Sequence, residues 1–403
     1  MNKPNTLLTL ALILTFFANA ISCSMCKITK NGKTVVGNNE DFFAANTAIH
    51  FRKGLNGNYG FAFLKYGDFG GFQGGMNEAG LVFDGFAVSE RKPRNTFEGK
   101  PPLDSALIVE IMQKCKSVYE VKSKFSKYDL NTINGGMHLF VDKEGNYLVV
   151  ESDTLTIGND PTYALSCFSP SSKENSNKVA LGICEKGKKL LASNFESNVD
   201  YCKMVMDTMH QDWKDGSGGT LYTTIYDLSE GTINLYFYHD YNHCIKFDLR
   251  KAFQKRDTVI SIPSLFPENK EGQKHFAYSN YAQTRIKLLK NIDYAKDSMK
   301  VKALVESDSV KPFIRFYETK INDWGYDYMN KGEILCAINL LKINTKYRPK
   351  SYNAFDSLGE AYMKNKQYDL ALKNYERSVE LDPNWENGKT QIAKLKELLK
   401  KKG

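Results

Sequence analysis

The sequence predicts an α+β layered domain followed by an all-α module of repeated helix pairs. The first domain is indicated by short β-type runs between turn dipeptides, which recur from residue 23 to about residue 249 with a few helical stretches among them. The second is indicated by a helical composition and an internal period beyond Pro263. With 403 residues, the chain is long enough for two domains that each bury a core.

Composition places the chain among folded proteins, since 42% of its residues are hydrophobic and 25% are charged. Its formal net charge of +9 is the property that could suggest a nucleic acid partner. The lysines are scattered, however, and the basic residues 400–402 close a predicted helix, whose C-terminus favours cations. We therefore expect a solvated basic surface and no nucleic acid partner.

The N-terminus has the pattern of a signal peptide, because an apolar run over residues 7–17 is followed by small residues. This run is too short to span a bilayer and no later stretch is apolar enough, so we expect an exported protein, periplasmic or secreted, without a transmembrane segment. Ala20 and Ser22 provide the small-residue pattern of a cleavage site that would make Cys23 the first residue. Cleavage after Ala20, which leaves Ile21 first, satisfies the same rule equally well.

Turn dipeptides divide the first domain into hairpins. Residues 27–30 and 33–36 flank Asn31-Gly32, the strongest short hairpin signal. Further expected elements are hairpins over residues 137–141 with 147–151 and 221–226 with 232–238, and helices over residues 103–115 and 200–211. Eight cysteines in an exported chain also suggest some disulfides, whose pairing the spacing does not decide.

The second domain shows a 34-residue period, the spacing of a tetratricopeptide repeat. The matching pairs are Gly325 with Gly359, Tyr328 with Tyr362, Met329 with Met363, Ala337 with Ala371, and Pro349 with Pro383. The small residues allow two helices to approach closely, and each proline ends the second helix of its unit. Residues 356–381 resemble the repeat most closely, and residues 389–399 would cap the stack.

Cys23, once it is the first residue, supplies both a thiol and an α-amino group. The amine has an unperturbed pKa of about 7.7–8.0, so its neutral form can take the thiol proton without any histidine. With the expected two-residue turn, Cys23 lies opposite Glu40, and a regular ladder directs Glu40, not Asp41, to the face of Cys23. A one-residue bulge near Gly37 would reverse that parity.

Residues 23–41, CSMCKITKNGKTVVGNNED, resemble the opening of the choloylglycine hydrolase and penicillin acylase family of linear-amide hydrolases. That family begins with a catalytic cysteine and a strand, and then returns to a Gly-x-Asn-x-Asp segment. Residues 77–81 (NEAGL) and 192–195 (ASNF) are similar to two later family segments, a turn and a short strand end. The resemblance covers roughly residues 23–250 and implies the four-layer αββα sandwich of N-terminal nucleophile (Ntn) hydrolases.

The resemblance implies a role for each matching residue. Cys23 would be the nucleophile, its own amine the base, and Asp41 the carboxylate that orients the amine and the thiol. The side-chain amide of Asn194 and the backbone N–H of Ala87 would stabilise the oxyanion. The implied activity is hydrolysis of an N-acyl amide through a thioester, and we expect no metal and no cofactor.

Three positions depart from the family pattern, since many members carry arginine where this chain has Asn38, asparagine where it has Ala87, and a second arginine at the place of Asp200. The change at Asn38 alters the charge around the thiol, so neither bile salts nor penicillins are named as substrates. Asn38 and Asn39 are the residues that we expect to bind the substrate, a small N-acyl amide.

Several alternatives stay open at this level. The segment before Cys23 is an imperfect lipoprotein signal, and lipidation would block the amine. The chain would then be an exported or lipid-anchored, non-catalytic binding protein that works through its repeats. An amine acceptor in place of water would make the same scaffold an acyltransferase. Cys23 and Cys26 also form a Cys-x-x-Cys pattern, but no second pair exists for a metal site.

We therefore divide the chain into a signal peptide, an Ntn-hydrolase catalytic domain, a helical linker and tetratricopeptide-like repeats that offer a surface to a protein partner. The corresponding residues are 1–22, 23–260, 261–310 and 311–403.

Overall fold

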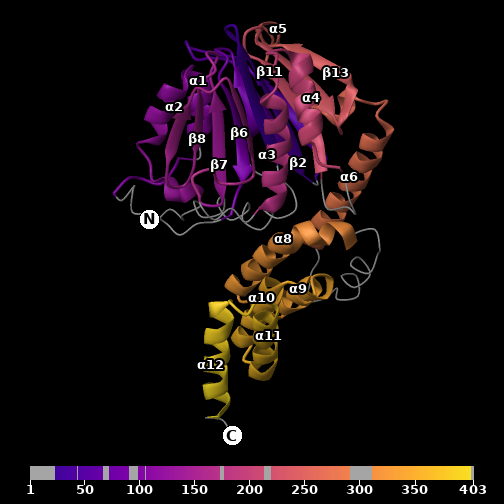
Figure 1. Cartoon of the computed structure of the whole chain (residues 1–403). Helices are drawn as coiled ribbons and strands as arrows, with labels where there is room; N and C mark the ends of the chain where they lie inside the picture. Colours follow the sequence, from indigo (N-terminus) through magenta and orange to yellow (C-terminus); the bar gives the residue numbers. More distant parts are fainter. Residues whose placement is uncertain are drawn as a thin grey trace. The chain divides into compact units, whose positions relative to one another are not determined.

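The computed structural model describes residues 23–42, 44–66, 72–89, 99–104, 106–172, 177–212, 219–290 and 311–400. The predicted signal peptide and cleavage site lie outside these residues. The chain divides into two compact units, Met1–Ser279 and Asn280–Gly403, and each is described by itself (Figure 1).

The first unit contains a six-stranded antiparallel sheet in the order β10-β1-β2-β11-β12-β13. Its strands are β1 (Ser24–Lys30), β2 (Lys33–Phe42), β10 (Thr162–Ser166), β11 (Gly219–Asp227), β12 (Thr232–Phe237) and β13 (Asp240–Asp248). Strands β1 and β2 are joined by Asn31 and Gly32, whose φ angles of 53° and 71° are the positive values that a type I′ turn requires. The predicted hairpin is confirmed, and its tight turn sets the register of the whole pair.

An eight-stranded antiparallel sheet, in the order β14-β3-β4-β5-β6-β7-β8-β9, forms the other half of the unit. Its strands are β3 (Thr47–Arg52), β4 (Phe61–Tyr66), β5 (Phe72–Asn77), β6 (Val82–Ala87), β7 (Gly136–Val141), β8 (Tyr147–Val150), β9 (Leu155–Gly158) and β14 (Thr258–Ser261). The other predicted hairpins are confirmed as β7–β8 and β11–β12.

Each sheet is covered by helices on its outer face, as Figure 1 shows. Helices α1 (Leu107–Lys114) and α2 (Val118–Phe125) pack on the eight-stranded sheet, whereas α3 (Lys178–Leu191) and α4 (Val199–Met209) pack on the six-stranded one. The apolar residues of both inner faces form one cluster between the sheets, so the layers follow the order αββα that the resemblance implied. The remaining helical segments are η2 (Leu130–Ile133), α5 (Leu249–Ala252), η3 (Pro263–Leu265) and α6 (Lys270–Lys290), and the last of these contains the boundary after Ser279.

The turn expected at residues 77–81 closes on the side chain of Asn77. Asn77 Oδ1 accepts hydrogen bonds from the N–H groups of Ala79 and Leu81, at 3.1 and 2.9 Å. Its Nδ2 donates to the carbonyls of Met112 and Cys115, which ties the turn to the end of α1. Asn77 is therefore a structural residue that connects the eight-stranded sheet with its covering helix.

The second unit consists of antiparallel helix pairs, as the 34-residue period predicts. Its described helices are α8 (Lys311–Asn330), α9 (Ile334–Tyr347), α10 (Tyr352–Lys364), α11 (Tyr368–Leu381) and α12 (Glu386–Lys400). Ala337 and Ala371, which occupy equivalent places in the two repeats, are both fully buried in the seam. A Cβ on Gly325 would lie 2.8 Å from Leu341, so α8 and α9 are as close as a glycine permits.

Within the described residues, no helix combines the length and the apolar character needed to cross a bilayer.

Helix α4 lies so close to the β1–β2 hairpin that we predict a packing defect when Gly37 of β2 gains a side chain. A Cβ on Gly37 would lie 2.5 Å from Met206 Cγ and 2.7 Å from Cys202 Sγ, and both side chains are fully buried. The Gly37→Ala variant should lose about 1–3 kcal/mol of unfolding free energy, because the helix must shift outward. Chemical denaturation measures this loss.

The matched control is Gly182→Ala in α3, where an added Cβ would meet nothing within 4 Å. This substitution should leave stability unchanged or raise it by about 0.5–1 kcal/mol, since alanine favours helix. Equal denaturation midpoints for the two variants would show that α4 does not press on Gly37.

Candidate active site

The candidate nucleophile Cys23 stands directly before β1, and its side chain is half-buried. The register of β1 with β2 pairs Ser24 with Asn39, which brings Cys23 to the level of Glu40 and Asp41. The Cys23 sulfur donates to Glu40 Oε1 at 3.5 Å and accepts a hydrogen bond from the Asp41 N–H at 3.4 Å. The Asp41 carbonyl oxygen is a second acceptor, at 3.6 Å.

The carboxylate beside the thiol is therefore that of Glu40, and the expected contact of the Asp41 carboxylate with the sulfur is wrong. No shift interrupts the β1–β2 register, so the proposed bulge near Gly37 does not occur on this side of β2. The irregularity lies instead in β11, between Thr220 and Tyr222. It leaves the alternation of β2 unchanged, so Glu40 and Asp41 point to opposite faces.

Glu40 is held from the opposite sheet, because the hydroxyl of Tyr66 on β4 donates to the same Oε1 that faces the sulfur. The Tyr66 ring is stacked on Phe42, with ring centroids 4.2 Å apart, which fixes the hydroxyl in place. Glu40 Oε2 is buried and has no hydrogen-bond partner among the described residues. Burial raises the pKa of Glu40 from an ordinary 4.5 to about 7, while the Tyr66 hydrogen bond opposes the rise.

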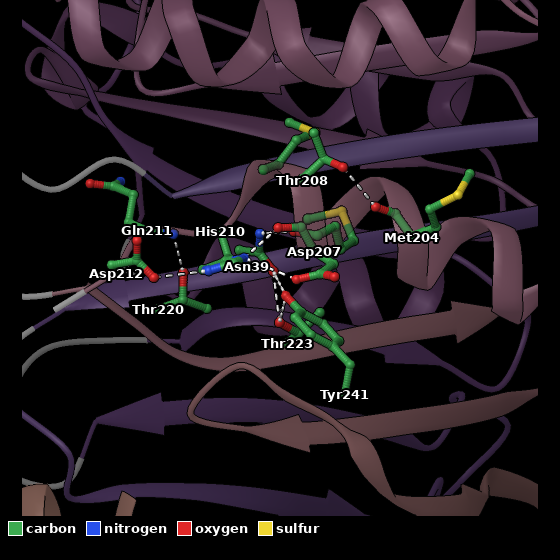
Figure 2. A network of polar contacts seen from close by, with 12 residues as sticks. Asn39, Met204, Asp207, Thr208, His210, Gln211, Asp212, Thr220, Thr223 and Tyr241 are labelled. Carbon is green, nitrogen blue, oxygen red and sulfur yellow. Dashed lines mark hydrogen bonds and ion pairs between the residues drawn. The ribbon is translucent and has the colours of Figure 1, made fainter. Parts of the chain in front are cut away.

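Asp41 uses its carboxylate on the other face of β2. Oδ1 accepts a hydrogen bond from the Thr220 hydroxyl, and Oδ2 accepts one from Gln211 Nε2 at 2.6 Å. The Gln211 N–H in turn donates to Thr220 Oγ1 at 2.9 Å, and Figure 2 shows these two residues beside each other. Burial raises the pKa of Asp41 well above its ordinary value, and the Thr220 hydrogen bond lowers it. Asp41 thus positions its own backbone N–H against the thiol.

The end of β10 fixes Cys23 from its other side. The Cys23 carbonyl accepts hydrogen bonds from Ser166 Oγ at 2.8 Å and from Cys167 Sγ at 3.7 Å. A hydrogen bond with Cys167, then burial, then the charge of Glu40 raise the pKa of the Cys23 thiol well above its ordinary value. At neutral pH the sulfur is consequently a thiol, and a nucleophile at this position needs a base that takes its proton.

Asn39 is excluded from substrate binding because protein contacts use its whole side chain. Asn39 Nδ2 donates to the Met206 carbonyl at 2.9 Å and to Ser24 Oγ at 3.3 Å. Its Oδ1 accepts from Thr223 at 2.7 Å and from Tyr241 at 3.4 Å. With no exposed surface, Asn39 joins β2 to α4 and β11, and the expectation that it contacts substrate is wrong.

Asn38 lies on the same face of β2 as Glu40 and is 1% exposed. Its Oδ1 is buried without a hydrogen-bond partner among the described residues. A substrate-binding role for Asn38 stays a prediction.

Asn194 does not lie at the site. It is exposed, in the turn after α3, where the sequence predicted a short strand end. Its neighbour Phe195 accepts a hydrogen bond from Lys30 Nζ at 2.8 Å, and Lys30 is the last residue of β1. Cys23 precedes the first residue of that strand, so the two ends are separated by roughly 20 Å. The assignment of Asn194 as an oxyanion donor is therefore wrong.

Ala87 ends β6 in the other sheet and pairs with Gly136 of β7. Phe86 and Val88, which flank it, belong to the same apolar cluster as Cys23. The use of its N–H as an oxyanion donor remains a prediction.

A polar network extends from Asn39 toward His210 (Figure 2). Tyr241 shares the Thr223 hydroxyl with Asn39, at 3.0 Å, and its ring lies 6.2 Å from that of His210. His210 Nε2 lies 3.2 Å from Asp212 Oδ1. This network fixes the end of α4 beside Gln211. The part of the chain that the structure describes holds no group of three or more His, Cys, Asp or Glu side chains suited to a metal ion.

Sequence reasoning did not find the residues from other elements that contact Cys23 or bind the side chains of Glu40 and Asp41. They are Tyr66 of β4, Ser166 and Cys167 at the end of β10, and Gln211 and Thr220 before and in β11. None belongs to a local motif, since each reaches the site only through the folding together of segments that are distant in sequence. The one available signal was the parity of the β1–β2 ladder, which favoured Glu40.

The helical unit matches a known repeat family. Residues 357–384 match the family model of the tetratricopeptide repeat, so the repeat expected over residues 356–381 is confirmed. Human superkiller complex protein 3 is 31% identical over 77 residues, which cover 19% of this chain and 5% of that protein. The chain thus spans a small part of the curated relative that it matches.

The first unit is similar to solved structures of amide-cleaving enzymes. A variant of the conjugated bile acid hydrolase from Clostridium perfringens is 16% identical, with a TM-score of 0.45 over 59% of this chain and 96% of that chain. Penicillin V acylase from Agrobacterium tumefaciens is 14% identical, with a TM-score of 0.45 over 59% and 90%. The Caenorhabditis elegans N-acylethanolamine-hydrolyzing acid amidase orthologue is 14% identical, with a TM-score of 0.39 over 59% and 99%. At such identities the likeness concerns the fold alone.

The buried carboxyl of Glu40 predicts a pH-dependent loss of stability. At pH values between 4.5, the ordinary pKa of Glu40, and about 7, its pKa in the folded protein, Glu40 keeps its proton in the folded state and loses it in the unfolded state. Stability therefore falls as pH rises through this window. A Glu40→Gln variant lacks this loss. The unfolding free energy of the variant minus that of wild type should therefore be larger at about pH 8 than at about pH 4.5, by on the order of 3 kcal/mol. Urea unfolding across the pH range measures the difference.

Glu110 provides the opposite control, because its hydrogen bond with Lys124 lowers its pKa. Glu110→Gln should lose stability relative to wild type as pH rises, since wild type gains from the ionised pair. A pH-independent difference between wild type and Glu40→Gln would show that folding does not raise the pKa of Glu40.

Proposed function

We propose that the first unit hydrolyses a linear amide bond in an N-acylated small molecule, with Cys23 as the nucleophile. The observation that carries this proposal is the position of the Cys23 sulfur, half-buried at the start of β1 between a carboxyl and a backbone N–H. A thiol in that place can lose its proton to a neighbour and keep its lone pair directed at a carbonyl carbon.

The proposed reaction has two halves. The Cys23 sulfur attacks the amide carbon while a base takes the thiol proton, and the C–N bond then breaks as the amine leaves with a proton. Water next adds to the resulting thioester, and the C–S bond breaks to release the carboxylic acid and restore the thiol. Both halves pass through a tetrahedral intermediate whose oxygen carries negative charge.

The backbone N–H of Ala87 is the donor that we propose for this oxygen, on the basis of the motif and of its place beside the cluster that contains Cys23. A backbone donor is already oriented by the β6–β7 ladder, so it costs no reorganisation when the charge appears. Loss of such a donor typically costs roughly 3–4 kcal/mol of transition-state stabilisation.

We further propose that the protein is exported, that cleavage before Cys23 frees its amine, and that the repeats of the second unit bind a protein partner. The stacked helix pairs of such repeats form an extended surface of the kind that binds other proteins.

Replacement of the nucleophile tests the proposal directly. Mature wild type, mixed with a panel of N-acyl amides and quenched in acid, should carry the acyl group on the peptide that begins with Cys23, detected by mass spectrometry. Cys23→Ala should show no adduct and lose amide hydrolysis by at least about 10³-fold. Cys26→Ala is the matched control, because Cys26 is a neighbouring, fully buried cysteine whose sulfur contacts Cys202 at 3.7 Å. Amide hydrolysis that survives in Cys23→Ala would overturn the assignment.

The proposal also requires a particular N-terminus. Intact-mass analysis of the exported protein should give Cys23 as the first residue with an unmodified α-amine. A retained Ile21 would leave that nitrogen in a peptide bond, and a diacylglycerol-modified Cys23 would indicate a lipid-anchored binding protein. Either result would contradict the proposed processing at Cys23, because neither leaves its α-amine free.

A further inference from the structure

We propose that the Glu40 carboxylate is the group that takes the proton of the Cys23 thiol during acylation and returns it to the departing amine. This inference rests on the proposed function, since it names the base of the same site. It replaces the side-chain role that the sequence gave to Asp41, and it competes with the α-amino group of Cys23 for the part of general base.

The hydrogen bonds at the sulfur give the thiol proton a direction. The Asp41 N–H donates to the Cys23 sulfur at 3.4 Å, so the sulfur accepts on that side. The sulfur donates toward Glu40 Oε1 at 3.5 Å, and the alternative acceptor is the Asp41 carbonyl at 3.6 Å. A carbonyl oxygen cannot keep a proton, whereas a carboxylate can. The same N–H that supports the thiol also stabilises the negative charge that grows on sulfur as the proton leaves.

Glu40 is held in place for this transfer. Tyr66 approaches from the opposite sheet and donates its hydroxyl to Oε1, and the stacked ring of Phe42 keeps Tyr66 from turning away. Glu40 Oε2 has no partner among the described residues, although it is buried. Oε1 is thus oriented at the sulfur, and it is the oxygen that takes the proton and holds it until the amine leaves.

Asp41 cannot take this role with its side chain. Its two carboxylate oxygens are occupied by Thr220 and Gln211 on the other face of β2. A rotation that brought the Asp41 carboxylate to the sulfur would break both hydrogen bonds and leave a buried Thr220 hydroxyl without its acceptor, at a cost of about 1–3 kcal/mol for each group.

The surroundings of Glu40 suit a base that works near neutral pH. The ionisable groups that interact with it come from several neighbouring elements: Cys23 before β1, Asp41 of β2, Tyr66 of β4, Asp84 of β6, and Tyr222 and Tyr226 of β11. Burial raises the pKa of Glu40 to about 7, so that the carboxylate forms at neutral pH and binds a proton readily once formed. The thiol pKa lies well above its ordinary value, so proton transfer must accompany the attack of sulfur on carbon.

The step balances without any further reactant. The Glu40 carboxylate accepts the S–H proton as the C–S bond forms, and the carbonyl π electrons move to oxygen. When the intermediate collapses, the C–N bond breaks and the Glu40 carboxylic acid protonates the nitrogen of the leaving amine. Glu40 is again ionised and can take a proton from the water that attacks the thioester.

Alkylation of Cys23 by iodoacetamide tests this base without any amide substrate. The rate constant, followed on the Cys23 peptide by mass spectrometry from about pH 5 to about pH 9, should rise in wild type through a midpoint near 7. Glu40→Gln should lose this rise and react about tenfold or more slowly at pH near 7.5. Asp142→Asn is the matched control, because Asp142 is also a fully buried carboxyl but lies in the β7–β8 turn, bonded to Asn146.

A second variant keeps the test meaningful if Glu40→Gln does not fold. Tyr66→Phe removes a hydrogen bond that favours the Glu40 carboxylate, so the alkylation midpoint should move to higher pH. A Glu40→Gln profile that coincides with wild type, or an unmoved midpoint in Tyr66→Phe, would overturn the proposal and leave the α-amino group as the base. Wild type with the expected alkylation profile but no hydrolysis of any amide would refute the proposed function alone.

Discussion

The register of the β1–β2 hairpin is the constraint on which the candidate site depends. A two-residue turn at Asn31 and Gly32 can close the ladder in one way only, and every residue up to Asn39 then has a determined partner. Because side chains alternate along a strand, this register decides that Glu40 faces the thiol and that Asp41 contributes its backbone N–H. A shift by one residue would exchange these two carboxylates and change the chemistry of the site.

The site is acidic, and burial of its carboxyl groups costs folding free energy. Three carboxyls, Glu40, Asp41 and Asp84, are buried near one another, and burial raises the pKa of each. Hydrogen bonds from Tyr66 and Thr220 recover part of the loss, because they favour the ionised forms. Shifted pKa values of this kind are typical of catalytic centres, where the pKa of an acid or base must differ from its value in water. The large apolar cluster between the sheets stabilises the fold and offsets the cost of burying these carboxyls.

Helix α4 packs against strand β2 and also positions residues that contact Asp41. Its side chains press on Gly37 from outside the sheet, and its end carries His210 and Gln211 to the level of Asp41. Asn39 links the helix to β2 through the Met206 carbonyl, so the strand that bears Glu40 and Asp41 is fastened on both sides. The carboxylates are consequently positioned by rigid elements and not by a loop, as a precise site requires.

The sequence by itself determined the elements and their local order. Hairpin turns and the helical spacing within residues 103–115 and 200–211 are local signals, because backbone sterics and side-chain periodicity act over a few residues. The 34-residue period that gives Ala337 and Ala371 equivalent places is likewise visible in the sequence alone. Tertiary structure alone decided which groups meet at Cys23 and at the neighbouring carboxyls Glu40 and Asp41. Tyr66, Cys167 and Thr220 arrive through strand pairing across long stretches of chain, and Asn194 is removed to the far end of β1 because α3 extends to Leu191. Contacts between distant segments depend on packing of the whole sandwich, which no short motif encodes.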